Sequence, residues 1–438
     1  MINLNKYKQF FLNFLVLTFP ISFLIGKAFV ETLLILISVY TLINLKNWKK
    51  YLIDKNFIIV LLFLYYTAIV LSTLLNIEVL SKATDQTLLL KSFSNFRFLI
   101  YIISIWYVLE EIKFNKYYFF IILTIYTLFL IDGYVQFFFG QNLIGYQMLP
   151  SGRITGVFND ELIFGSYIQK VIPIILIMFF LILKADTKYH FLLISLLSLS
   201  SVIIFFSGDR TPIILYTFFF IISFICLSKL RKIILLNFFV TIFFSVLIVL
   251  SGGGKNINSL ENRYNLKSEY NLLNLKNPVD NSSKILKYVP RDHYGHFLVV
   301  KEMLKDNLIF GKGIRSFRVL CRGKLGNLYP INNGVCSTHP HNYYLQSLSA
   351  GGLIAFLLLV AIFLIFTLKL IKIFLELFKN QKKNYILNLA IISFFVYLWP
   401  LAPTGNFFSN WIACFNCFVL AIYLFLNSDT GDKNKLLI

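Results

Sequence analysis

The sequence predicts an all-α polytopic membrane protein, with about twelve transmembrane helices and a large extracytoplasmic loop. Of its 438 residues, 58% are hydrophobic and only 14% are charged, and the mean hydropathy is +0.74. Ordinary soluble domains carry about 25% charged residues, and a single soluble core stops growing near ~250–300 residues. A soluble enzyme, a disordered chain and a disulfide-stapled secreted domain are therefore excluded. Membrane helices remain, because they satisfy their own backbone hydrogen bonds in an apolar surrounding.

Apolar runs of spanning length, each of roughly 17–25 residues, follow one another along the chain. The fourth run is the least regular, since Lys91 and Arg97 crowd its start. The first run has no small-residue cleavage site and a second follows at once, so we interpret it as a retained helix rather than a signal peptide. The expected spans are 10–26, 28–45, 57–75, 94–110, 117–138, 162–183, 190–207, 211–228, 232–250, 343–369, 385–403 and 407–426.

The formal net charge of +21 is explained by membrane topology, since cytoplasmic loops are enriched in Lys and Arg. Alternate short connections, such as 46–55 and 369–383, hold far more Lys and Arg than the short connections between them. We therefore expect these connections and both termini in the cytoplasm, and we expect membrane lipids rather than nucleic acid as partners.

One long connection, 251–342, is expected on the extracytoplasmic side and contains 14 Lys and Arg against six Asp and Glu. Loops of this length are usually functional or disordered. From Arg291 to Phe310 the spacing of apolar residues predicts a helix with one apolar stripe that consists of Phe297, Val300, Met303, Leu304 and Leu308. The chain is thus expected to have three parts: helices in 1–250, the loop in 251–342 with short helices, and the last helices with a cytoplasmic tail in 343–438.

The five cysteines fall into two groups. Cys226, Cys414 and Cys417 lie in apolar runs and are expected to behave as small hydrophobic residues. Cys321 and Cys336 lie in the long loop, where an oxidising compartment would allow them to pair. The spacing alone leaves a disulfide between them open.

Three polar clusters at the expected outer membrane edge are candidates for chemistry, because ionisable groups there are costly and tend to be functional. The first is the turn 207–212, in which Arg210 is either functional or an arginine snorkelling beside its own Asp209. The second begins at Arg291 and is either functional or the solvated start of a helix. The third, 339–346, contains His339 and His341. Two imidazoles would need further metal ligands, so we favour a catalytic or hydrogen-bonding histidine.

The third cluster carries a resemblance. His341-Asn342, followed after nine residues by Gly352, resembles the signature of the bacterial O-antigen ligase family. The similarity extends over roughly 150–360 and includes Arg153-Ile-Thr-Gly-Val-Phe158, the turn at Arg210, Arg291, and Leu308-Ile-Phe-Gly-Lys-Gly313 with Phe317. The sequence departs from the family at Ala355 and His296. The resemblance implies a fold like that of GT-C glycosyltransferases, in the bacterial inner membrane, with an active site facing the periplasm.

The family resemblance also implies a reaction. A glycan would move from undecaprenyl diphosphate to lipid A–core in lipopolysaccharide assembly, by an inverting transfer without cofactor or metal. Arg210 and Arg291 would stabilise the departing diphosphate, because guanidinium groups bind phosphate oxygens in pairs and stay charged. His341 would be the general base, with His339 as its competitor. The expected substrate-binding residues are Arg153, His339, Asn342 and Arg315.

Alternatives remain open at this point. An O-antigen or exopolysaccharide polymerase and a protein O-oligosaccharyltransferase would use the same donor with another acceptor. A polysaccharide or lipid transporter would use no catalysis and would need polar groups along a path through the membrane. The expected spans contain few such groups, among them Glu31 and Lys170.

Overall fold

The computed structural model describes residues 4–46, 49–52, 57–78, 87–184, 186–252, 291–321, 336–378 and 384–428. Within these ranges the chain is helical and contains no β-strand. The principal helices are α1 (Leu4–Leu17), α2 (Phe19–Ile25), α3 (Lys27–Asn44), α4 (Lys49–Leu52), α5 (Phe57–Leu75), α7 (Leu88–Phe93), α8 (Arg97–Glu111), α9 (Lys116–Phe139), α10 (Phe164–Leu183), α11 (His190–Phe206), α12 (Arg210–Cys226), α13 (Arg231–Leu250), α16 (Arg291–Met303), α17 (Ser316–Leu320), α19 (Tyr343–Leu375), α20 (Tyr385–Tyr397) and α21 (Asn410–Asn427).

The helices fit a multi-pass membrane protein. In the described part of the chain, nine are long and apolar enough to span a membrane, and a tenth arises if the bent pair α1 and α2 forms one span. This pair bends by 64° at a break that precedes Pro20, whose ring has no N–H to donate to the preceding turn. The apolar helices α12 and α20 are shorter. The polytopic all-α fold is thus confirmed, while the number twelve stays a prediction.

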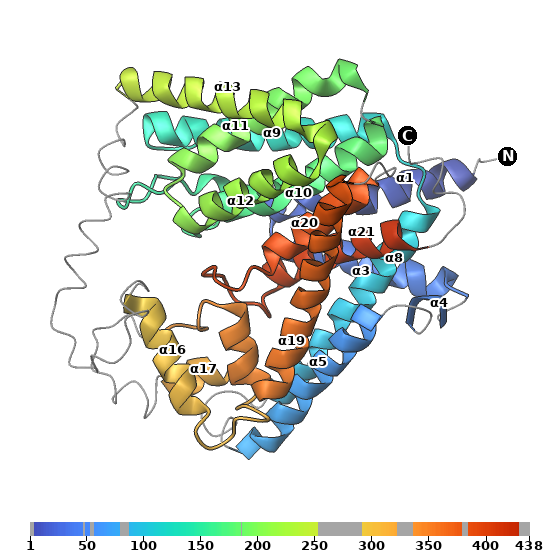
Figure 1. Cartoon of the computed structure of the whole chain (residues 1–438), viewed down its shortest axis with the longest axis vertical. Coiled ribbons are helices and arrows are strands. Elements are labelled where there is room, and N and C mark those ends of the chain that lie inside the picture. The colour runs from blue at the N-terminus through green and yellow to red at the C-terminus, as the bar shows by residue number, and fades with distance from the viewer. Residues whose placement is uncertain are drawn as a thin grey trace.

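The helices pack into one body, with α19 against α5, α21 against α8, and α11 against α13 (Figure 1). Helix α10 is almost entirely enclosed, whereas α13 at the edge of the body exposes large side chains such as Phe238, Phe239 and Phe243. An apolar face of this kind suits contact with lipid. In Figure 1, α16 and α17 lie at the lower left, and α1 and α4 lie at the right.

Two charged residues within the expected spans, Glu31 and Arg97, contact each other and neighbouring polar groups. The Glu31 carboxylate lies 3.7 Å from Arg97 and accepts a hydrogen bond of 2.9 Å from the Tyr101 hydroxyl. Arg97 also donates to the side chain of Asn410 at 2.5 Å. These contacts explain how Arg97 is accommodated at the start of α8, and they make Glu31 part of the helix packing.

The long helix α19 is interrupted at Gly352, whose backbone is not helical (φ 64°, ψ −160°). The interruption leaves carbonyl groups before it and N–H groups after it without helical partners. The segment 308–313 supplies them. Lys312 and Gly313 donate to the carbonyls of Ser349 and Ala350 at 2.9 and 3.0 Å. The N–H groups of Leu353 and Ile354 donate to the carbonyls of Leu308 and Ile309 at 2.9 and 3.4 Å.

Two glycines make this approach possible. A Cβ on Gly352 would lie 2.2 Å from the Ile309 carbonyl oxygen, and one on Gly311 would lie 2.4 Å from the Gly352 nitrogen. Both glycines also have a positive φ, which only glycine adopts at little cost. The break at Gly352 holds the first turns of α19 in place. His341 and Asn342 come directly before these turns, which gives the spacing from His341 to Gly352 a structural reason.

The helix expected over 291–310 is shorter than predicted, since α16 ends at Met303. Val300, Met303 and Leu304 are buried with Phe317 in a second small core. Phe297 and Leu308, expected on the buried stripe, are exposed. Three of the five stripe residues are thus buried as expected. The prediction fails at Leu308 because the chain leaves the helix and 308–313 pairs with the interrupted α19, whereas Phe297 lies within α16 but on its exposed side.

Candidate active site

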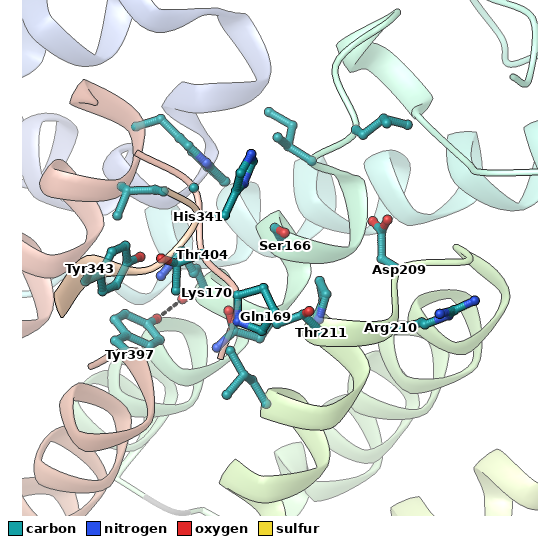
Figure 2. Close-up of a pocket in the computed structure, with 18 of the residues that line it drawn as sticks. Ser166, Gln169, Lys170, Asp209, Arg210, Thr211, His341, Tyr343, Tyr397 and Thr404 are labelled. Atoms are coloured by element: carbon teal, nitrogen blue, oxygen red, sulfur yellow. Dashed lines mark hydrogen bonds between the residues drawn. The ribbon is translucent and has the colours of Figure 1, made fainter. Parts of the chain in front are cut away.

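A cavity of about 530 Å³ lies where four separate parts of the chain meet. They are the residues before and in the first turns of α10, the turn that leads into α12, the start of α19, and the connection from α20 to α21 (Figure 2). The lining residues are Arg153, Leu162, Ile163, Ser166, Gln169, Lys170, Asp209, Arg210, Thr211, Pro212, Leu215, His341, Tyr343, Tyr397, Pro403, Thr404, Gly405, Trp411 and Ile412.

Three of the residues expected in the site line this one cavity: Arg153, Arg210 and His341. In the view of Figure 2, the guanidinium of Arg210 extends away from His341, so the two groups lie on different sides of the site. Arg291 begins α16, and its side chain lies outside what the structure describes. Arg210 and His341 therefore line the same cavity from different sides, and the place of Arg291 and the catalytic roles of all three residues stay predictions.

The Asp209 carboxylate organises the arginine side of the cavity. It forms an ion pair with Arg153, whose side chain is 18% exposed, and it accepts a hydrogen bond of 3.1 Å from the N–H of Gly165 in the first turn of α10. A carboxylate at a helix N-terminus is favourable. A Cβ on Gly165 would meet Asp209 at 2.8 Å, so glycine permits this approach. The sequence offered Asp209 as partner of the adjacent Arg210, and the structure adds Arg153 as a distant one.

His341 is held in an unusual backbone conformation with φ 49°. Its carbonyl accepts a hydrogen bond of 2.8 Å from the N–H of Thr404. Its ring stacks on His296 of α16, with centroids 5.2 Å apart, and its centroid lies 4.1 Å from that of His339. A left-handed conformation at a residue other than glycine is strained and persists where its surroundings over-determine it. Three of the five histidines thus gather beside the cavity, and His341 is the one that lines it.

His339 is half-buried. Burial, followed by the charge of His341, lowers its pKa to about 4, and Arg318 acts in the same direction. Its Nδ1 lies 2.8 Å from the hydroxyl of Thr338. At neutral pH His339 is therefore uncharged. His341 lines the cavity and His339 is not among the described residues that do so, which favours His341 as the residue that meets the substrate.

Asn342 and Arg315 were expected to bind substrate, and neither is among the described residues that line the cavity. The Asn342 side chain caps α19 by accepting from the N–H groups of Tyr344 and Leu345 at 3.0 and 3.1 Å. Its amide donates to the Pro400 carbonyl at 2.7 Å. Asn342 therefore ties His341 to the connection between α20 and α21. Arg315 is exposed and precedes α17 with φ 59°.

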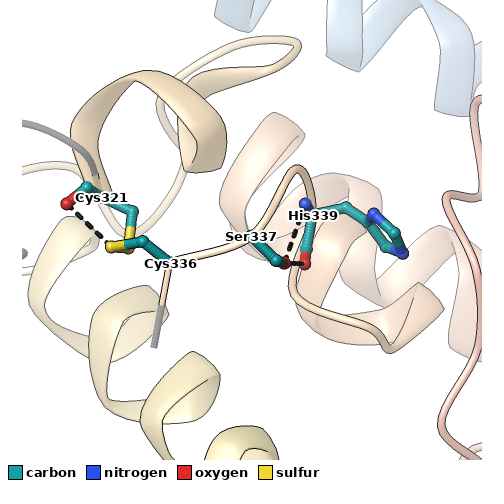
Figure 3. The surroundings of a disulfide bond; sticks show 4 residues. All are labelled: Cys321, Cys336, Ser337 and His339. Carbon is teal, nitrogen blue, oxygen red and sulfur yellow. Dashed lines mark hydrogen bonds between the residues drawn. A yellow bond between two sulfur atoms is a disulfide. The ribbon is translucent and has the colours of Figure 1, made fainter. Parts of the chain in front are cut away.

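A disulfide joins Cys321 and Cys336, with Cα atoms 5.5 Å apart (Figure 3). It connects the end of α17 to the short segment that leads to His339. Ser337 extends this connection, since its hydroxyl donates to the His339 carbonyl and accepts from the His339 N–H at 3.3 Å. The pairing that the sequence left open is thus present, and it restrains the approach to the histidines. Cys226, Cys414 and Cys417 keep their thiols and are buried, as expected.

Several lining residues escaped sequence reasoning. Lys170 was noted only as a charge within a span, and Gln169, Tyr397 and Thr404 gave no signal of their own. Lys170 is 6% exposed, its ammonium lies 4.3 Å from the centre of the Tyr397 ring, and the Tyr397 hydroxyl donates to its backbone carbonyl. Lys170 and Tyr397 are far apart in the sequence, and only the packing of their helices brings them together in one cavity.

Comparison with known proteins agrees with this geometry. Residues 193–360 match the family model described as O-antigen ligase. No curated protein matches the chain. The matched range contains Arg210, His341 and the interrupted part of α19, while Arg153, Lys170 and Thr404 complete the cavity from outside it. The chain is therefore a multi-pass membrane protein in which residues 193–360 are similar to the O-antigen ligase family.

Proposed function

We propose that this protein is a membrane glycosyltransferase that moves a glycan from undecaprenyl diphosphate to lipid A–core during lipopolysaccharide assembly. The observation that carries the proposal is that a histidine and two arginines from distant parts of the chain line one cavity. The family domain supports a glycan and a lipid as the classes of substrate.

The chemistry assigns a role to each side of the cavity. His341 takes the proton from the acceptor hydroxyl, since an imidazole titrates near neutral pH. The hydroxyl oxygen forms a bond to the anomeric carbon as the bond from that carbon to the diphosphate oxygen breaks, with inversion and without a covalent intermediate. Arg210, with Arg291, stabilises the negative charge that develops on the departing diphosphate. Arg153 adds a cation whose position Asp209 fixes.

The proposed topology has twelve spans with both termini in the cytoplasm and the cavity open to the periplasm. The spans that exceed the nine long apolar helices are the bent pair α1 and α2 and the shorter helices α12 and α20. The disulfide between Cys321 and Cys336 supports this orientation, because structural disulfides persist in oxidising compartments such as the periplasm. His341 follows it closely along the chain and would lie on the same side.

The alternative enzymes, an O-antigen or exopolysaccharide polymerase and a protein O-oligosaccharyltransferase, share the donor and differ in the acceptor. A transporter is less well supported. Of the two span residues that were candidates for a transport path, Glu31 is engaged by Arg97 and Tyr101, and Lys170 lines the cavity together with His341.

Reconstitution tests the proposal directly. The purified full chain in liposomes receives a glycan on undecaprenyl diphosphate together with lipid A–core, with and without EDTA. We expect transfer to lipid A–core by the wild type, unchanged by EDTA. His341→Ala should lower the rate by about 10²–10⁴-fold, the usual contribution of a general base. His190→Ala, at the start of α11, is the matched control.

The outcomes separate the candidates. Elongation of the glycan on its lipid carrier would replace the ligase by a polymerase. Full activity of His341→Ala would refute the assigned base. Activity lost with EDTA and restored by a divalent ion would refute the metal-independent reaction. Movement of the lipid-linked glycan across the membrane without any transfer would favour a transporter.

A further inference from the structure

We propose that Lys170, Gln169 and Thr404 form a phosphate-binding subsite in the depth of the cavity, and that it takes a phosphate group of the lipid-linked donor. This inference rests on the proposed function for the identity of the ligand. The subsite itself rests on two buried polar side chains, Gln169 and Lys170, and on the buried hydroxyl of Thr404, all of which line one cavity.

Helix α10 places two of them. Ser166, Gln169 and Lys170 are spaced so that they share one face of the helix, and all three line the cavity. At 1.5 Å per residue, Lys170 lies about 9 Å along the axis from the first residue of α10. Lys170 and Gln169 are 6% and 4% exposed. Both are therefore polar groups in the interior of a membrane helix, where such groups are costly and tend to be functional.

Lys170 has no counter-ion among the described residues. Its charge faces the ring of Tyr397, 4.3 Å from the ring centre, and the hydroxyl of Tyr397 is engaged with the backbone of Lys170. A ring face offsets part of an ammonium charge. Burial of a charge without an ionic partner remains unfavourable, which leaves Lys170 suited to an anion that enters the cavity.

The neighbouring groups are also available. In the described part of the chain, Nε2 of Gln169 and Oγ1 of Thr404 are buried and have no hydrogen-bond partner. Lysine can donate three hydrogen bonds, the glutamine amide two and the threonine hydroxyl one. Figure 2 draws the three residues near the centre of the view, whereas Arg210 lies at its right. Because most of these groups are hydrogen-bond donors, the cluster fits a ligand whose oxygen atoms only accept hydrogen bonds, such as phosphate.

The surroundings favour phosphate on a lipid. Asp209, the acidic residue in the lining, is already paired with Arg153, so the cavity keeps an excess of positive charge. Apolar residues such as Leu215, Pro212 and Ile412 complete the wall. Apolar walls beside a deep cation match a phosphate that is attached to a hydrocarbon chain.

Binding measurements on the full chain in nanodiscs test this subsite. The probes are undecaprenyl phosphate, undecaprenol, which has the same chain without phosphate, and inorganic pyrophosphate. The variant is Lys170→Met, which keeps the length of the side chain and removes its charge. Lys188→Met, at an exposed lysine paired with Asp186, is the matched control. Thr404→Val is a second, nearly isosteric variant.

We expect the wild type to prefer undecaprenyl phosphate to undecaprenol. Lys170→Met should bind the phosphate lipid about 10- to 100-fold more weakly, the loss typical of a hydrogen bond to a charged group, with unchanged binding of undecaprenol. Thr404→Val should weaken binding about 2- to 10-fold. Lys170→Met should also melt at the same or a higher temperature, because it removes a buried charge. If Lys170 had only a structural role, Lys170→Met would melt at a lower temperature and would bind undecaprenyl phosphate as tightly as the wild type.

The results distinguish the subsite from the reaction. Lys170→Met and Thr404→Val with wild-type affinity, or a wild type that does not discriminate the two lipids, would overturn the subsite even if glycan transfer occurs. Lys170-dependent binding in a protein that transfers no glycan would support the subsite and overturn the transferase. Lys170-dependent binding of pyrophosphate would support recognition of the phosphate alone. If undecaprenyl phosphate binds and pyrophosphate does not, the phosphate that the subsite takes would be one attached to a lipid.

Discussion

Replacing Gly352 by alanine is expected to disturb the docking of 308–313 on α19 and to destabilise the protein. Gly352 has φ 64° and ψ −160°, a conformation nearly confined to glycine, and strain of this kind costs about 1–3 kcal/mol. The new Cβ would lie 2.2 Å from the Ile309 carbonyl oxygen, a backbone atom that cannot rotate away. The docked segment would therefore have to withdraw.

Withdrawal would weaken the four backbone hydrogen bonds that cross the break. At about 0.5–1.5 kcal/mol each, they represent about 2–6 kcal/mol, and with the strain the expected loss in free energy of unfolding is about 3–9 kcal/mol. The assay is unfolding in mixed micelles by titration with a denaturing detergent, accompanied by thermal melting in the same mild detergent.

Gly140→Ala provides the matched control. Gly140 also has a positive φ, 84°, but no atom lies within 4 Å of a Cβ placed there. Its substitution should cost only the backbone term, about 1–2 kcal/mol. If Gly352→Ala and Gly140→Ala unfold at the same detergent fraction and temperature, close docking at the helix break does not stabilise the fold, and the reasoning is refuted.

Two further predictions follow from the site. Asp209→Asn removes the partner of the partly buried Arg153 and should lower the free energy of unfolding by about 3–5 kcal/mol, as for a broken buried ion pair. The control Glu161→Gln breaks the exposed pair with Lys27 and should cost at most about 1 kcal/mol, so equal melting temperatures would contradict the role of Asp209. The pKa of His339 is lowered to about 4, so between the ordinary value near 6.5 and about 4 the unfolded chain binds the proton more readily. Stability should therefore fall as the pH decreases through this window. His339→Gln should reduce this loss of stability. If the melting temperatures of the wild type and of His339→Gln fall equally from pH 7.5 to 4.5, the assignment to His339 is disproved.

The fold class could be predicted from the sequence because apolar runs of spanning length have a single structural solution in a membrane. The ends of the helices were less predictable. The span expected over 94–110 begins earlier in the structure, at Leu88. Arg97 lies within that span as the first residue of α8, where Glu31 and Asn410 contact its side chain. The expected helix from Arg291 ends early, since backbone pairing of 308–313 with α19 outweighs the local periodicity.

The candidate site was only partly predictable. Arg153, Arg210 and His341 are polar residues in short patterns at the ends of apolar runs, so their positions along the chain already indicated the outer edge. Lys170 and Thr404 belong to no pattern. Asn342 matched the pattern, but its side chain caps α19 and binds the Pro400 carbonyl. A motif therefore located the site without separating the residues that face the cavity from those that position them.

The sequence by itself determined that this chain crosses a membrane repeatedly, that cations and histidines gather at the ends of its apolar runs, and that it resembles the O-antigen ligase family. These properties depend on composition and on neighbours in the chain, which the sequence contains. Only the tertiary structure decided that Asp209 pairs with Arg153, that Cys321 joins Cys336, and that Lys170 shares a cavity with His341. Such contacts depend on how separate helices pack, and packing is governed by shape and burial across the whole chain rather than by any local pattern.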